Sequence, residues 1–145
     1  MDILVTPKGL RAAIVDTRAQ FQAALHGAHH NWDKSPAGGE GEESWSPRKV
    51  AEHFIGTDWH FTNSISQACG APALERPSID VSSPAAAAAS ATLVAATNDN
   101  ILRHVSDGDL SKTWMGPLGK RTVEELLTIM ASHGHDHVNQ IKAAS

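Results

Sequence analysis

Hydrophobic residues recur at intervals of three and four along four separate stretches of this 145-residue chain. This spacing places them on one face of an α-helix, so each stretch predicts an amphipathic helix of about 20–24 residues. The expected inward positions, in chain order, are Leu10, Ile14, Thr17, Phe21 and Leu25; Val50, Phe54, Thr57, Phe61, Ile65 and Ala68; Leu93, Thr97, Ile101 and Val105; and Val123, Leu126, Met130, His133, His137 and Ile141.

Each predicted helix begins at a start signal. A hydroxyl residue directly precedes a proline at Thr6-Pro7, Ser46-Pro47 and Ser83-Pro84, the pair expected for an N-cap followed by the first helical position. The fourth start, Thr122-Val123-Glu124-Glu125, is a capping box. We expect the first helix to run to about His30, the second to stop before Gly70, and the third to end near Gly108.

The connecting segments are rich in turn residues. Residues 31–45 form an irregular loop, and Gly70–Ser82 is long enough to cross the end of a bundle. Residues 107–121 contain an ordered turn that can pack Trp114 on the bundle. Strand-like alternation never exceeds a few residues. The sequence therefore predicts an all-α four-helix bundle forming one domain over residues 1–145.

Composition and charge exclude several classes of protein. Hydrophobic residues make up 41% and charged residues 19%, as in soluble globular domains. A net charge of −4 without a basic block argues against a nucleic-acid partner. The longest apolar run, Ala85–Ala89, is far too short for a membrane span, and the N-terminus lacks a signal peptide, so we expect a cytoplasmic protein.

The one cysteine, Cys69, excludes an internal disulfide and a zinc site built on paired cysteines. It lies near the C-terminal end of the second predicted helix, where the helix dipole disfavours a thiolate. A catalytic cysteine is therefore not expected.

Two of the nine histidines lie on an apolar helix face. His133 and His137 are one turn apart and continue the stripe of the last helix, whereas His135 is on the opposite side and should face solvent. Inward imidazoles need partners for their nitrogens, which either a metal ion or hydrogen bonds can provide. The spacing suits two ligands of one metal ion.

A third ligand is expected on the second helix. His53 borders the apolar stripe and is the first choice, and His60, two turns further along, is the reserve, with a partly exposed structural role as its alternative. His26 and His30 share the same spacing but lie at a polar helix end with His29, where imidazolium is favoured by the dipole, so they are weak metal candidates. His104 is expected to be a half-buried packing residue.

Two segments carry a family resemblance. The start of the second predicted helix reads Trp45-Ser46-Pro47-Arg48-Lys49-Val50-Ala51-Glu52-His53-Phe54. The last helix reads Thr122-Val123-Glu124-Glu125-Leu126-Leu127, followed by His133-x-x-x-His137-x-x-Gln140-Ile141. In this order and spacing they resemble the corresponding motifs of the DinB superfamily, including its YfiT-like members.

The resemblance implies an up-up-down-down-type bundle with one long crossover, and a divalent metal, often zinc or nickel, held by His53, His133 and His137. It also implies a homodimer. Relatives include transferases and isomerases that use low-molecular-weight thiols, proposed metal-dependent hydrolases, and proteins with no known reaction. Three departures stand out: Lys49 replaces the usual glutamate, Phe54 replaces the usual leucine, and Gly134 lies between two of the implied ligands, where it can leave room for a neighbouring chain or a substrate.

Three neutral imidazoles would leave positions open on the metal, as in catalytic sites. The metal could activate water for hydrolysis or a low-molecular-weight thiol for transfer, acting on a small-molecule substrate. Asp58 or Asp136 can serve as an acid–base partner, although the 100° rotation from His137 favours an exposed Asp136. Trp59 and Trp114 can line a substrate pocket or pack in the core. The alternatives are a non-catalytic metal- or ligand-binding bundle, such as a stress-related module, and a metal-free bundle whose histidines satisfy one another.

Overall fold

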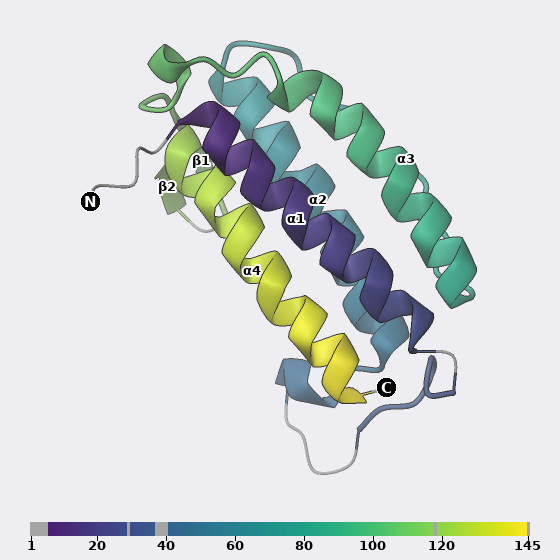
Figure 1. Cartoon of the computed structure of the whole chain (residues 1–145). Helices are drawn as coiled ribbons and strands as arrows, with labels where there is room; N and C mark the ends of the chain where they lie inside the picture. Colours follow the sequence, from purple (N-terminus) through teal and green to yellow (C-terminus); the bar gives the residue numbers. More distant parts are fainter. Residues whose placement is uncertain (1–5, 29, 37–40, 118, 145) are drawn as a thin grey trace.

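Four long helices pack side by side in the computed structural model, which describes residues 6–28, 30–36, 41–117 and 119–144 (Figure 1). The helices are α1 (Pro7–His26), α2 (Pro47–Ala68), α3 (Pro84–Leu102) and α4 (Val123–Ala144). Short 3₁₀ helices, η1 (Gly41–Ser44) and η2 (Asp107–Asp109), and two strands, β1 (Thr113–Gly116) and β2 (Gly119–Thr122), lie in the connections. The predicted all-α four-helix bundle is confirmed. Within the described ranges, no helix is both long enough and apolar enough to cross a membrane.

The helices begin at the predicted caps. The side chains of Thr6, Ser46 and Ser83 each accept a hydrogen bond from a backbone N–H in the first turn of α1, α2 and α3. At α4, the Thr122 hydroxyl accepts from the Glu125 N–H at 3.0 Å, and the Glu125 carboxylate accepts from the Thr122 N–H at 3.2 Å. These bonds satisfy donors that the first helical turn leaves without a partner.

Two helices end earlier than expected. Helix α1 stops at His26 rather than near His30, because Gly27 caps it and the chain turns back to bury Trp32, whose indole Nε1–H donates to the Val81 carbonyl at 2.9 Å. Helix α3 stops at Leu102 rather than near Gly108. There the Asp109 carboxylate accepts hydrogen bonds from Ser106, which begins the separate turn of η2.

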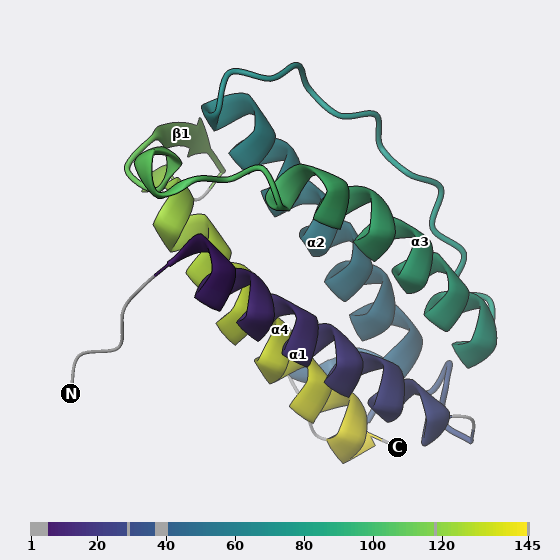
Figure 2. The ribbon, with the colours of Figure 1, turned by 45° about the horizontal axis from the view of Figure 1, so that its top comes forward.

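Helices α1 and α4 run in one direction and α2 and α3 in the other (Figures 1 and 2). Residues 69–83 form one long crossover, as expected, but it follows the length of the bundle instead of crossing its end (Figure 2). Along this path the Leu74 N–H donates to Asn63 of α2 at 2.7 Å, and the Trp59 indole donates to the Glu75 carbonyl at 3.0 Å. The order of directions therefore differs from the up-up-down-down arrangement implied by the resemblance.

The buried face of α3 is displaced from the predicted one. Leu93, placed inside by the apolar pattern, is 71% exposed, and Thr97 is also exposed. The buried positions include Ser90 and Asn98, which the predicted stripe does not contain. Both have partners, because Ser90 exchanges hydrogen bonds with the backbone of Asp80 and the Asn98 amide donates to Asp58. The predicted inward positions of the other three helices are buried or partly buried.

The antiparallel hairpin of β1 and β2 was not predicted. Its strands have only four residues each, too few to show alternation, and pair with Thr113 opposite Thr122 and Gly116 opposite Gly119. Gly119 adopts a φ of +88°, which side chains rarely tolerate. Trp114 is half-buried beside the bundle, as expected. Leu118, in the same turn, lies outside the described residues.

Candidate metal centre

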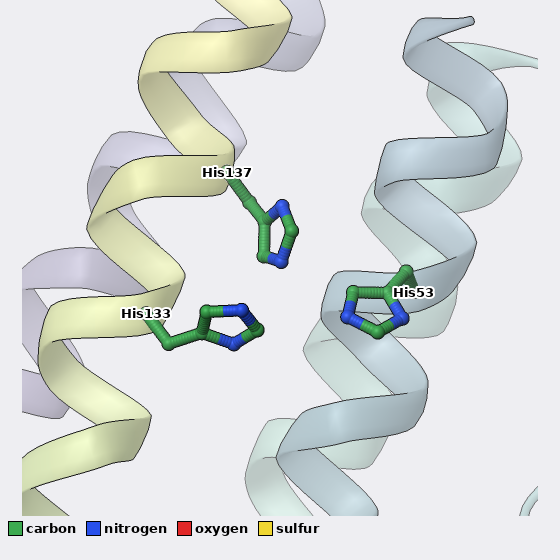
Figure 3. Close-up of side chains that lie close together, drawn as sticks. All are labelled: His53, His133 and His137. Carbon is green, nitrogen blue, oxygen red and sulfur yellow. The ribbon is translucent and has the colours of Figure 1, made fainter. Parts of the chain in front are cut away.

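Three histidines meet where α2 faces α4. His133 and His137 project from successive turns of α4, and His53 projects from α2 towards them (Figure 3). One possible ligand nitrogen from each ring lies within 4.8 Å of the other two. The ring centroids are 4.8 Å apart for His53 and His137, 5.8 Å for His53 and His133, and 4.4 Å for the pair on α4. The structure thus brings together all three histidines proposed as ligands.

The centre lies at the boundary between the interior and the surface. His137 is only 2% exposed, whereas His53 and His133 are half-buried. Along α4, the pair separates Met130 of one hydrophobic cluster from Val138 of the other. The two half-buried histidines and the buried His137 therefore lie between the two apolar clusters.

Two polar side chains contact the imidazoles from outside the group. The Oε1 of Gln140 lies 3.2 Å from Nδ1 of His137, and the hydroxyl of Thr57 lies 3.4 Å from Nε2 of His53. When Nδ1 of His137 carries the proton and donates it to Gln140, Nε2 keeps the lone pair that a metal requires. Hydrogen bonds of this kind orient metal-binding histidines.

The three rings fit a divalent metal ion in chemistry and size. Zinc binds imidazole nitrogens at about 2.0–2.1 Å in tetrahedral geometry, so two ligand nitrogens on one ion are about 3.4 Å apart. A nitrogen pair at the 4.8 Å limit would have to close by roughly an ångström or more, which requires rotation of the histidine side chains when the ion binds. Imidazole donors suit zinc and nickel, and also copper and iron.

Gly134 permits this arrangement. A β-carbon at this position would lie 2.8 Å from Cγ2 of Thr17 in α1 and 3.0 Å from Cε2 of Phe54 in α2. The space beside Gly134 is therefore filled by the same chain, rather than by a neighbouring chain or a substrate as the sequence suggested. The phenyl ring of Phe54 is itself stacked on Phe21 at 4.0 Å. This close contact brings α4 up to α1 and α2 at the level of the histidines.

Asp58, one candidate acid–base partner, belongs to a half-buried network linking three helices. It accepts hydrogen bonds from Nε and Nη2 of Arg18 at 2.7 and 2.8 Å, and from Asn98 at 2.7 Å. Burial lowers the pKa of Arg18, but its hydrogen bonds and ion pairs with Asp58 and Asp99 outweigh that effect, so the pKa is raised overall. Asp58 and Arg18 line a cavity of about 20 Å³ together with His133 and His137. The Asp58 carboxylate therefore links α1, α2 and α3. The sequence did not reveal this role, because Arg18 and Asn98 are each 40 residues away from Asp58 in the chain.

The remaining candidates lie elsewhere. Asp136 and His135 are exposed, as expected, and so are His26 and His30. His104 is exposed and is not the half-buried packing residue that was predicted. His60, the reserve ligand, is not part of the group of three, and its ring centroid lies 5.8 Å from that of Phe61 and 6.5 Å from that of Trp59. His29 lies outside the described residues.

His53 also lines an open groove of about 580 Å³ between α2 and the crossover. Trp59 lines this groove, in agreement with the prediction that it lines a pocket or packs in the core. Trp114 lines a separate small pocket, together with His60. Trp45, Lys49 and Arg76 also line the groove, and sequence reasoning gave them no role in a site. The one sequence feature that could have pointed to this groove is Lys49, which stands where the family usually has a glutamate.

Cys69 is the C-cap of α2 and is half-buried. Burial raises the pKa of its thiol, and the nearby Asp109 carboxylate raises it further, against an opposing effect of Lys112. The protonated thiol is therefore favoured, consistent with the prediction that Cys69 is not a nucleophile.

The fold and the centre define a four-helix bundle with a histidine cluster between two facing helices, an arrangement compatible with metal binding. A family model described as the DinB superfamily matches residues 13–141, and the chain belongs to this superfamily. The resemblance seen in the two motifs is thereby confirmed. Comparison with curated proteins gives no significant match, and neither does comparison with solved structures.

Proposed function

We propose that this protein binds one divalent metal ion, zinc or nickel, through His53, His133 and His137 and uses it to transform a small molecule. The observation that carries the proposal is the convergence of three imidazoles from two helices within 4.8 Å. When bound, such an ion would supply Lewis-acid chemistry that activates water or a low-molecular-weight thiol, for hydrolysis or group transfer. Homodimerisation, implied by the resemblance, belongs to the same proposal.

The chain's own residues would hold the ligands in position. Oε1 of Gln140 would accept a hydrogen bond from the protonated Nδ1 of His137, and the Thr57 hydroxyl would restrain the ring of His53. Phe54 and Met130, both buried, place apolar side chains on the inner side of the centre, beside the cavity of about 20 Å³. Because His53 also lines the groove beside α2, the outer side is the route for a substrate.

A second candidate function is non-catalytic binding of a metal or ligand. The positions of the two candidate acid–base carboxylates favour it. Asp58 is engaged by Arg18 and Asn98, and Asp136 faces solvent. Asp58 borders the small cavity that it shares with His133 and His137, but both of its oxygens already accept hydrogen bonds from Arg18 and Asn98, so its role there is structural.

Metal analysis of protein purified without a histidine tag tests the proposal. The wild type should hold close to one metal ion per chain, and its melting temperature should fall in chelator, because a ligand that binds the native state stabilises it. His133→Ala should lose the metal. His135→Ala is the matched control, since it removes an exposed imidazole from the same helix. Less than about 0.2 ions per chain, with an unchanged melting temperature in chelator, would overturn the metal site.

Turnover separates the two candidate functions. The metal-loaded protein should hydrolyse activated esters or amides, or add glutathione-like thiols to electrophiles, and His133→Ala should not. A protein that binds the metal but shows neither reaction is a binding module.

A further inference from the structure

We propose that the groove beside His53 is a binding site for a small organic anion, with carboxylate as the recognised group and a flat apolar body. The groove lies between the outer face of α2 and the crossover, and its volume of about 580 Å³ is within the range of small-molecule sites. Its lining includes Trp45, Lys49, Glu52, His53, Trp59 and Arg76.

Two tryptophans provide the apolar surface. Trp45 precedes α2, and its ring lies edge-on to the ring of His53 at 5.2 Å. Trp59 is fixed by the hydrogen bond from its indole to the Glu75 carbonyl of the crossover. Both are half-buried, so each presents part of an ordered ring to the groove. Such rings bind flat apolar groups at little entropic cost.

A cationic side chain lies over the ring of each of these two tryptophans. Lys49 Nζ lies 4.8 Å from the centroid of Trp45, and the guanidinium of Arg76 lies 5.9 Å from that of Trp59. The attraction between a cation and an aromatic face restrains both side chains within the groove. Glu52 is the one carboxylate among the lining residues that the structure describes, and with Lys49 and Arg76 it leaves these residues one positive charge in excess, on a chain whose net charge is −4. A concave site of this sign concentrates anions.

The position of His53 links the groove to the metal centre. The same imidazole borders the groove and belongs to the group of three histidines. An anion held by Lys49 or Arg76 would therefore lie next to the proposed metal. That the anion is the substrate rests on the proposed function, whereas its binding by the groove depends only on the groove residues.

Titration followed by NMR of the indole N–H groups tests the site. In the metal-free protein, benzoate should shift the signals of Trp45 and Trp59 and leave Trp32, which is 5% exposed and bonded to Val81, unmoved. Benzamide, with the same shape and no charge, and acetate, with the charge and no ring, should both bind more weakly.

Charge variants supply the decisive comparison. Lys49→Gln/Arg76→Gln should weaken benzoate binding about tenfold or more, the size expected when charged hydrogen bonds are lost. Lys34→Gln/Arg103→Gln changes the net charge equally at two exposed residues outside the groove and should bind as the wild type does. Glu52→Gln should tighten binding, because it removes the opposing carboxylate.

Equal binding of benzoate and benzamide, or equal binding by the two double variants, would overturn the site. Binding that appears only in the metal-loaded protein and survives Lys49→Gln/Arg76→Gln would also overturn it, and would leave the metal centre standing. Conversely, benzoate binding by a wild type that takes up no metal would support the groove and remove the proposed metal function.

Discussion

Gly134 of α4 and Thr17 of α1 are in such close contact that a β-carbon on the glycine would lie 2.8 Å from the threonine Cγ2. Real side chains essentially never approach so closely, and Phe54 crowds the same position from α2. The glycine therefore sets the distance between helices at the level where His133 and His137 face His53. Helix packing and the candidate metal centre depend on the same small residue.

Replacing Gly134 by alanine should destabilise the protein although alanine is the better helix former. The gain in helix propensity is about 1 kcal/mol, whereas forcing an extra carbon into a packed site costs about 1–3 kcal/mol. We expect a net loss of about 1 kcal/mol in the free energy of unfolding, measured by urea denaturation.

Gly56→Ala is the matched control, because Gly56 also lies inside a helix but a β-carbon there would meet nothing within 4 Å. It should stabilise the protein by about 0.5–1 kcal/mol. Thr17→Ser removes the crowding methyl group and keeps the hydroxyl that donates to the Ala131 carbonyl, so it should partly rescue Gly134→Ala. If Gly134→Ala stabilised the protein as Gly56→Ala is expected to, the packing of Thr17 and Phe54 against Gly134 would have room for a β-carbon, and the prediction would be wrong.

Asp58→Ala should lower the free energy of unfolding by about 3 kcal/mol or more, because it leaves Arg18 in a largely buried site without its bidentate partner. The side chains of Arg18 and Asp58 are only 11% and 10% exposed. Asp33→Ala breaks the exposed ion pair with Arg48 and should cost less than about 1 kcal/mol. Thermal or urea unfolding compares the two. Comparable losses would contradict a structural role for Asp58.

Replacing Gln140 by alanine should weaken metal binding about 10- to 100-fold without removing a ligand, since it removes the hydrogen-bond partner that orients His137. Asn139→Ala, an exposed neighbour on the same helix, should leave the affinity unchanged. Competition with a chromophoric chelator measures both constants. If the two variants bind metal equally well, the Gln140 contact does not contribute to the site.

The turn before the hairpin should stabilise the protein in a pH-dependent way. The hydrogen bond from Lys112, followed by those from Ser106, lowers the pKa of Asp109 from 3.8 to about 2. Because the native state favours the charged carboxylate, its contribution is fully present above about pH 4 and is lost as the pH falls towards 2. The stability difference between wild type and Asp109→Asn, from urea unfolding at several pH values, should therefore shrink from pH 5 to pH 2. A constant difference would contradict this linkage.

The helix starts and the histidine pair of α4 were predictable because they depend on short-range order. A cap such as Ser46 bonds to Lys49, three residues away, and the orientation of His133 and His137 follows from the 3.6-residue period of one helix. His53 borders the apolar stripe of α2 and also matches the family motif, which made it the third candidate ligand. Local sequence therefore determined four helices, the inward faces of three of them, and the candidate ligands.

Only the tertiary structure decided which of these features meet. His53 and His60 lie on nearly the same face of α2, and the level at which α4 packs against α2 brings His53 into the group and leaves His60 out. The buried face of α3 was mispredicted because Asn98 gains a partner, Asp58, 40 residues away. The groove likewise combines Trp45 and Lys49 with Arg76 of the crossover. Contacts between residues far apart in the chain depend on how the helices pack, which apolar periodicity does not encode.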